Sequence, residues 1–217
     1  MTPKVYTHFS SLSQGTSTDG VRWRTLLQFG DSWDIKGSVV MKNPGKSSFL
    51  HNNHDAITAP DLLAQLNTFD DGVQKADWYE FNADSTMKCI GELFAEYYAA
   101  RGEVLNGVIQ IFNLFYLREV NLGKALEKSK TADLADMSDY DTSHLVAPIY
   151  LGFAGLARHK QHGATAEKFF NAAQSLGTTY LNKDFSQNTF THPLYLMRYG
   201  RSKPSSIAIR QEFCKMA

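Results

Sequence analysis

The protein has 217 residues, no net formal charge, 43% hydrophobic residues and 20% charged residues. This balance is typical of a globular protein, so we expect one domain over residues 1–217 and no long disorder. The zero net charge argues against a generally basic protein, although not against a local basic groove. No apolar run approaches the ~20 residues of a membrane span.

The predicted elements follow a start rich in Ser, Thr and Gly. Residues 1–20 have no continuous apolar stretch of the kind that a signal peptide needs, and we expect them to be mobile. Apolar runs that end at Gly, Asn or Pro predict strands, and apolar residues at helical spacing predict helices. In chain order these are strands at 21–30 and 37–42, an insertion without clear period at 46–83, a helix at 84–102 with Asp84 or Ser85 as its cap and Gly102 at its end, a strand at 107–117, a helix at 122–137, a strand at 144–155, a helix at 164–177, a strand at 178–182 and a helical tail from Ser205.

This alternation predicts an α/β fold, with three layers (α/β/α) and a mostly parallel central sheet covered by helices on both faces. In such a sheet, binding sites form at the carboxyl ends of the strands. We therefore expect Asn43, Asn113 and the loop after Leu181 on one edge of the molecule.

The cysteines and histidines show no metal-binding spacing. Cys89 and Cys214 form neither a disulfide framework nor a metal motif, which is typical of free thiols in a cytoplasmic protein. We expect no metal site.

The stretch VVMKNPGKSS, residues 39–48, has two interpretations. Its GKSS part resembles the end of a phosphate-binding P-loop, which needs a first glycine five residues before Gly45. That position is Val40, so a P-loop nucleotide hydrolase is disfavoured. The other interpretation depends on two later segments.

Three segments at predicted strand ends, in chain order, are MKNPGK (41–46), IFNLFYLR (111–118) and THPLYL (191–196). Together they resemble the motifs of the uracil-DNA glycosylase superfamily. The similarity is closest to a little-characterised bacterial and phage branch, which also has segments similar to RTLLQFGD (24–31) and DSTMKCIGELFA (84–95). The resemblance covers about residues 22–197; the insertion and the tail exceed it.

The resemblance implies a uracil-DNA-glycosylase-like fold and a monofunctional DNA glycosylase without metal or cofactor. Its partner would be DNA, either double-stranded with a flipped base or single-stranded, with no membrane and no obligate protein partner. Asn43 and His192 would be catalytic: the Asn43 carbonyl orients the attacking water, and the His192 N–H binds the carbonyl oxygen of the departing base. The alternatives are a simple Asn-Pro-Gly turn and a loop histidine that stabilises a turn.

The remaining site residues divide between the base and the DNA backbone. Asn113 offers a donor and an acceptor to a pyrimidine edge, or else satisfies backbone groups at a strand end. The other residues expected at the base are Lys42, Pro44, Gly45 and Phe49. Those expected at the DNA are Lys46, the wedge residues Leu194 and Tyr195, and Arg198, Arg201 and Lys203 in a basic C-terminal tail, 198–217. Core packing is the alternative for the apolar residues, and a solvated surface is the alternative for the charged ones.

Gly45 bears on the choice of base. In the strict uracil enzymes of the superfamily the corresponding residue is a Tyr that blocks C5 of the pyrimidine, so a glycine implies an open C5 side. A tight turn can also require glycine, because glycine reaches positive φ without strain. The expected function is removal of a C5-modified pyrimidine, of the hypermodified cytosine type, in DNA repair or in defence against phage. The alternative is a non-catalytic protein that binds a modified base or nucleotide.

Overall fold

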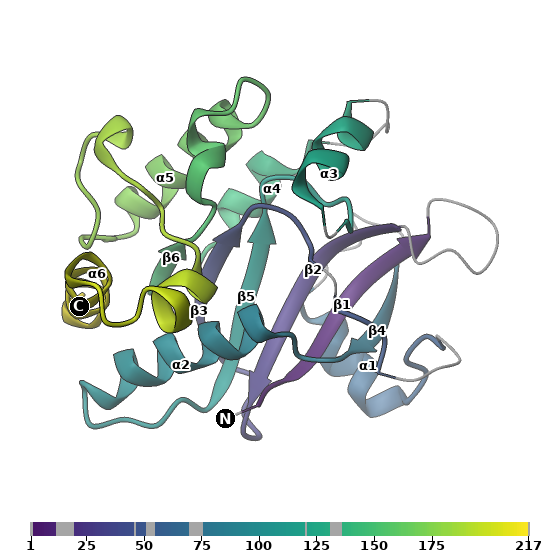
Figure 1. The fold of residues 1–217 in the computed structure, drawn as a ribbon. Helices are drawn as coiled ribbons and strands as arrows, with labels where there is room; N and C mark the ends of the chain where they lie inside the picture. The colour runs from purple at the N-terminus through teal and green to yellow at the C-terminus, as the bar shows by residue number, and fades with distance from the viewer. Residues whose placement is uncertain are drawn as a thin grey trace.

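The computed structural model of the protein describes residues 2–11, 20–45, 47–50, 55–69, 76–119, 121–130 and 136–216. In this part the chain is a mixed α/β protein with a six-stranded sheet in the order β4-β1-β2-β5-β3-β6 (Figure 1). The strands are β1 Lys4–Ser11, β2 Gly20–Phe29, β3 Ile35–Met41, β4 Asp77–Phe81, β5 Gly107–Asn113 and β6 Ile149–Leu151. The helices are α1 Pro60–Asn67, α2 Ser85–Ala99, α3 Leu122–Ser129, α4 Ser138–Ser143, α5 Gly163–Ser175 and α6 Pro204–Lys215, with short helices η1 Ala154–Arg158, η2 Phe185–Gln187 and the π-helical η3 Tyr195–Tyr199.

The sheet is not mostly parallel, so that prediction is wrong. β3 pairs with β5 and β6 in parallel, but β1 pairs antiparallel with β2 and β4, and β2 pairs antiparallel with β5. The difference comes from two segments that showed no strand signal. The start of the chain, expected to be mobile, supplies β1, and the supposed insertion supplies α1 and β4. Residues 12–19 of that start lie outside the described part of the chain.

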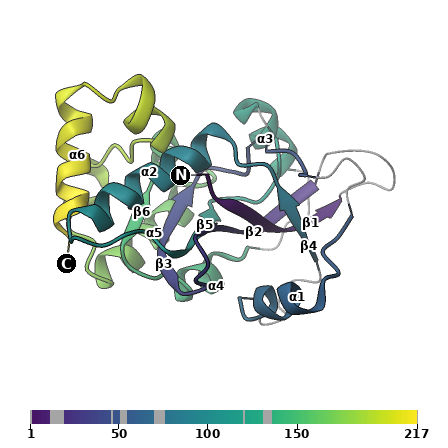
Figure 2. The ribbon, with the colours of Figure 1, turned by 90° about the horizontal axis from the view of Figure 1, so that it is seen from below.

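Helices pack against both faces of the sheet (Figures 1 and 2). One face packs on α2 and α6 through a core that includes Val39, Ile109, Leu93 and Phe213. On the opposite face one core, which includes Val40 and Phe169, packs on α5, and another, which includes Leu66, packs on α1. Neighbouring residues Val39 and Val40 enter different cores because side chains alternate along a strand. The structure therefore has helices on both faces of the sheet, as the sequence predicts.

Most predicted elements agree with the structure, and one does not. β2, β3, α2, α5 and α6 lie where the sequence predicts them, whereas β5, β6 and α3 are shorter than expected. The segment 178–182 is not a strand. Its Tyr180 hydroxyl accepts a hydrogen bond from the Leu151 N–H at 2.8 Å, so a side chain takes the position that a neighbouring backbone strand would fill.

Helix α2 begins where capping chemistry predicts. The Asp84 carboxylate accepts a hydrogen bond from the Met87 N–H at 2.9 Å, which satisfies one of the free donors of the first turn. The helix buries Ile90, Leu93 and Phe94 against the sheet. Gly102 follows it with φ at +72°, a conformation that favours glycine. This arrangement fixes the N-terminus of α2 beside the ends of β3 and β5.

A β-bulge in β2 changes which side chains face α2. Thr7 and Phe9, two residues apart in β1, pair with Thr25 and Arg22, three residues apart in β2. The extra residue in β2 reverses the alternation of side chains beyond it. Arg22 therefore lies on the same face as Thr25 instead of the opposite one.

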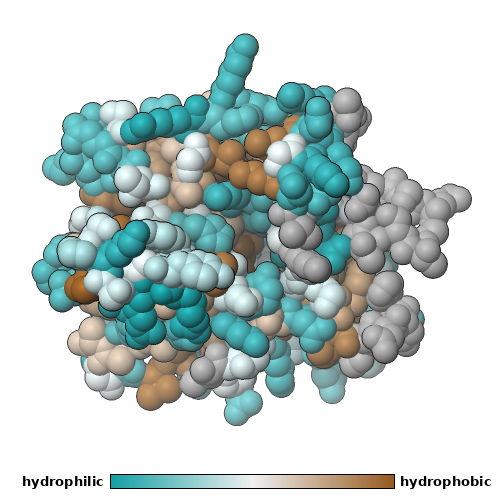
Figure 3. Space-filling view, in the orientation of Figure 1, coloured by the Kyte–Doolittle hydropathy of each residue, from teal (hydrophilic) through white to brown (hydrophobic). Residues whose placement is uncertain are grey.

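The face of the molecule seen in Figure 3 is mostly hydrophilic, with apolar side chains visible in separate groups. None of the helices in the described part of the chain is both long and apolar enough to cross a membrane.

Candidate functional site

A pocket of about 210 Å³ lies where β3 and β5 end and α2 begins. The strand β2 contributes Arg22 and Thr25, and the end of β3 contributes Met41, Lys42, Asn43 and Gly45. The remaining lining residues are Asp84, Thr86, Met87, Ile90, Ile111, Asn113, Glu119, Leu122 and His192. Asn43, Asn113 and His192, which are far apart in the sequence, therefore line a single pocket.

The side chain of Asn43 is held in one orientation. Its amide nitrogen donates hydrogen bonds to the Glu119 carbonyl at 2.9 Å and to the Pro44 carbonyl at 3.2 Å. Its Oδ1 atom has no hydrogen bond to any residue in the described part of the chain. An amide fixed through its nitrogen presents its oxygen as an acceptor, which can orient a water molecule. The loop is held from a second side by Arg118, which donates to the Ser47 carbonyl at 2.9 Å.

Asn113 is the last residue of β5 and is buried, with 3% of its surface exposed. Its side chain has no hydrogen bond within the described residues, so it is not used to satisfy nearby backbone groups. A buried amide without partners that lines a pocket is suited to a ligand with both a donor and an acceptor.

The imidazole of His192 is neutral at physiological pH. Burial lowers its pKa to about 4, and the positive charge of Lys42 acts in the same direction. The Leu194 N–H donates to Nδ1 at 3.3 Å, so Nδ1 is the acceptor and Nε2 carries the proton. This tautomer presents a neutral N–H donor to the pocket.

The loop that carries His192 is seated on the end of β6. The Tyr150 hydroxyl donates to the Thr191 carbonyl at 2.6 Å. Pro193 packs so closely on Gly152 that a Cβ at Gly152 would lie 2.8 Å from the proline ring. Gly152 is therefore needed for the close approach of the His-Pro loop to the sheet.

Arg22 lines the pocket, although the sequence did not suggest it as a site residue. It is 4% exposed, and its Nε and Nη1 atoms are buried without a hydrogen-bond partner among the residues that the structure describes. Burial lowers its pKa to about 10, so it keeps its charge at neutral pH. Only the β-bulge turns Arg22 towards the pocket, and no residue pattern in VRWRTL marks that bulge.

Asp84, Thr86 and Glu119 also line the pocket and were not predicted as site residues. For Asp84 a signal was available, because it caps the helix that begins beside the Asn-Pro-Gly loop.

Gly45 is not required by the backbone. Its φ is outside the positive range, and a Cβ there would meet only the Asp84 Oδ2 atom, at 3.6 Å, an ordinary contact. The turn therefore does not explain the glycine. Lys42, which is half-buried beside it, has its pKa lowered by burial.

The other residues expected at the base or the DNA, as far as the structure describes them, do not line this pocket. Pro44 is buried behind the loop, and Phe49 packs against Phe9 and Phe81 at ring distances of 5.0 and 4.5 Å. Leu194 packs on the core beside α2, whereas Tyr195 is 38% exposed. Core packing, the alternative for these apolar residues, therefore describes Phe49 and Leu194. Lys46 lies outside the described residues.

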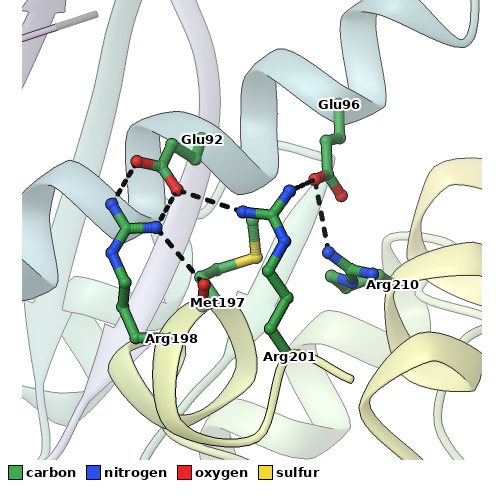
Figure 4. Close-up of polar contacts among 6 residues, drawn as sticks. All are labelled: Glu92, Glu96, Met197, Arg198, Arg201 and Arg210. Atoms are coloured by element: carbon green, nitrogen blue, oxygen red, sulfur yellow. Dashed lines mark hydrogen bonds and ion pairs between the residues drawn. The ribbon is translucent and has the colours of Figure 1, made fainter. Parts of the chain in front are cut away.

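The basic stretch after the His-Pro loop is partly neutralised by α2 (Figure 4). Arg198 forms a two-fold hydrogen-bonded ion pair with Glu92. Arg201 approaches Glu96 at 3.3 Å, and Arg210 shares the same carboxylate at 3.4 Å. Lys203 lies over the Tyr195 ring at 5.2 Å. The two arginines expected at the DNA thus hold η3 against α2.

Within the described ranges, no group of three or more His, Cys, Asp or Glu side chains could hold a metal ion. No protein-family model matches the chain, and neither the curated proteins nor the solved structures contain a match.

Proposed function

We propose that the protein is a DNA glycosylase, related to the uracil-DNA glycosylase superfamily, that hydrolyses the N-glycosidic bond of a flipped pyrimidine and leaves an abasic site. The observation that carries this proposal is the convergence of Asn43, Asn113 and a neutral His192 on one pocket. A base must leave the helical stack before it can enter such a pocket.

The three side chains suit the steps of this hydrolysis. The Asn43 Oδ1 atom, held by the bond from its amide to the Glu119 carbonyl, orients a water towards the sugar carbon. Asn113 pairs with the edge of the pyrimidine. The N–H of His192 donates to the carbonyl oxygen of the base, where negative charge collects as the bond breaks. The neutral imidazole keeps this N–H on Nε2, because Nδ1 accepts the hydrogen bond from the Leu194 N–H.

The substrate proposed is a pyrimidine modified at C5, of the hypermodified cytosine type. Gly45 lines the pocket and the backbone does not require it, which favours a role for the missing side chain. Such bases occur in damaged DNA and in modified phage DNA, so repair and antiviral defence are the two settings. Both use the same chemistry at this site.

The test is release of the base from oligonucleotides that each contain one uracil, thymine, 5-methylcytosine or 5-hydroxymethylcytosine. Alkali cleaves the strand at an abasic site, so product appears as a shorter strand. We expect cleavage with the native protein and a strong loss with Asn43→Ala. The matched control is Asn182→Ala, because Asn182 is exposed and lies away from the pocket.

A protein that only binds a modified base is the second candidate, and the free Asn113 amide is compatible with it. Tight binding of the same oligonucleotides without any strand cleavage would support the binder and overturn the glycosylase. A binding protein needs Asn113 but has no use for a water oriented by Asn43.

A further inference from the structure

Arg22 and Asp84 are opposite charges in the same pocket that do not contact each other. Arg22 is buried, and within the described ranges its Nε and Nη1 atoms have no hydrogen-bond partner. Asp84 uses Oδ1 to cap α2, and its Oδ2 has no partner within the described residues. Both side chains line the same pocket, and the negative charge of Asp84 raises the pKa of Arg22 against the effect of burial. They form no ion pair with each other in the described part of the chain, so Asp84 Oδ2 and the Arg22 guanidinium both remain open to a ligand in that pocket.

Asp84 also borders the space that Gly45 leaves open. A Cβ on Gly45 would point towards Asp84 Oδ2, which is 3.6 Å from it. If a pyrimidine binds with C5 towards Gly45, as in the proposed function, a substituent on C5 reaches Asp84 and then Arg22.

Resting on the proposed function, we propose that Arg22 and Asp84 bind a hydroxyl group carried on C5, and that the protein selects 5-hydroxymethyl pyrimidines. The hydroxyl donates its hydrogen to Asp84 Oδ2 and accepts a hydrogen bond from the Arg22 guanidinium. One small group thus satisfies an acceptor and a donor that the protein leaves unpaired.

Other substituents fit this pair less well. A methyl group would occupy the space but leave the buried guanidinium of Arg22 without a partner, which is costly for a buried charge. A carboxylate would pair with Arg22 and be repelled by Asp84. A backbone phosphate stays at the mouth of a base pocket, whereas only 4% of Arg22 is exposed.

Binding of nucleosides tests the inference without requiring cleavage. Calorimetry compares 5-hydroxymethyl-2′-deoxycytidine with 5-methyl-2′-deoxycytidine, which differ only in the hydroxyl. A site built around a hydroxyl rejects the analogue that lacks it, so we expect the native protein to prefer the hydroxymethyl nucleoside by about tenfold or more. In Asp84→Asn the preference falls to about twofold or less, and Asn still caps α2, since Asn and Asp are equally good caps. Arg22→Met should lower the preference to the same extent, because it removes the donor to the hydroxyl oxygen.

Two matched controls keep the preference. Asp184→Asn changes another capping aspartate, at η2, and Arg158→Gln changes an exposed arginine; neither lines the pocket. If Arg22→Met does not fold, the Asp84→Asn result decides alone.

The inference is overturned if the native protein binds both nucleosides equally, or if the preference survives in Asp84→Asn. It is also overturned if a 5-carboxyl nucleoside binds more tightly than the hydroxymethyl one, because Asp84 would then not face the substituent. If the protein prefers the hydroxymethyl nucleoside but releases no base from DNA, the hydroxyl site is supported and the glycosylase activity is overturned. If it releases the base but shows no preference for the hydroxyl, the glycosylase activity is supported and the hydroxyl site is overturned.

Discussion

The two halves of the sheet contribute to the pocket in different ways. In the parallel half, β5, β3 and β6 run in the same direction, so their carboxyl ends meet at one edge. Asn43 and Asn113 follow directly from this, because Asn113 is the last residue of β5 and Asn43 lies in the loop just after β3. In the antiparallel half, β2 runs against β5, so the beginning of β2 lies beside the end of β5. The first residues of β2 thereby reach the same edge.

This difference separates neutral polar side chains from a buried charge. The parallel half supplies neutral side chains that suit hydrolysis, with donors and acceptors fixed by neighbouring backbone. The antiparallel half supplies Arg22, a buried charge that the fold leaves unpaired. A buried unpaired charge is unfavourable for folding, so its presence points to a ligand. The predictions below test this division.

The largest effect is expected at Asn43, in the parallel half. Asn43→Ala removes the group that orients water and should slow base release about a hundredfold or more, while the fold is kept. Single-turnover release from modified oligonucleotides measures the rate, and circular dichroism checks the fold. A folded variant with the native rate would remove Asn43 from the chemistry.

His192 and His162 form a matched pair, because the pKa of each is lowered by burial. Burial lowers the pKa of both His192 and His162 to about 4, from 6.5. The unfolded chain then binds more protons between these values, so stability is full above pH 6.5 and falls as the pH drops towards 4. His192→Gln and His162→Gln should each weaken this fall, as measured by urea unfolding at several pH values.

Base release distinguishes the same two variants. His192→Gln should lose about a hundredfold, because the flexible Gln amide does not hold its N–H where the fixed imidazole ring holds it for the developing negative charge. His162→Gln should lose nothing, because His162 lies outside the pocket. Equal losses in both variants would mean that the effect at His192 is structural.

Replacements of Gly45 sharpen the question of substrate. Gly45→Tyr should fill the C5 side and reduce acceptance of 5-hydroxymethylcytosine about tenfold or more, while uracil still fits. Gly45→Ala should keep both substrates, because its Cβ makes only an ordinary contact with Asp84. Competition between the two bases in one reaction measures the preference. Loss of both substrates in the Ala variant would contradict the open-pocket explanation.

In the antiparallel half, Arg22→Met should stabilise the empty protein. An apolar side chain of similar size replaces a buried charge without partners, so we expect a gain of about 1 kcal/mol in the free energy of unfolding. Urea unfolding in the absence of ligand measures it. A loss of similar size would mean that the guanidinium supports the fold, through its position 5.4 Å from the Phe81 ring, and is not reserved for a ligand.

The smallest effect concerns the basic stretch outside both halves. Glu92→Gln releases Arg198 from its ion pair, so DNA affinity should rise by a few-fold and the dependence of affinity on salt should steepen by up to about one unit. Glu212→Gln is the control, because Glu212 pairs with Lys215 on α6. An unchanged slope would place Arg198 away from the DNA and leave it a purely structural role on α2.

The sequence predicted the parallel half better than the antiparallel half, for physical reasons. VVMKNPG, GVIQIFN and the cap at Asp84 carry local signals, because a buried run followed by a turn or a capping aspartate is sufficient to predict the element. β1 and β4 carry no such signal: Val5, Tyr6 and Trp78 are buried on account of neighbours that are distant in the sequence. The expectation of a mostly parallel sheet failed for this reason.

The site residues divide in the same way, into those marked by local sequence signals and those that depend on distant segments. Asn43, Asn113 and His192 were predicted from strand ends and a resemblance, and they line one pocket. Arg22 depends on one extra residue in β2, and Arg198 depends on a glutamate more than a hundred residues away in the chain. Neither relation can be read from local sequence, since both arise only when the sheet and α2 are assembled.

The most direct test of the shared pocket is a nuclear magnetic resonance titration of ¹⁵N-labelled protein with 5-hydroxymethyl-2′-deoxycytidine. The signals to follow are the His192 ring, from the parallel side, and the Arg22 Nε–H, from the antiparallel side, each assigned with its variant. We predict that both shift together with one binding constant, while those of His162 and Arg158 stay in place. If His192 and Arg22 do not respond, or respond with different binding constants, the two halves do not form one base-binding site.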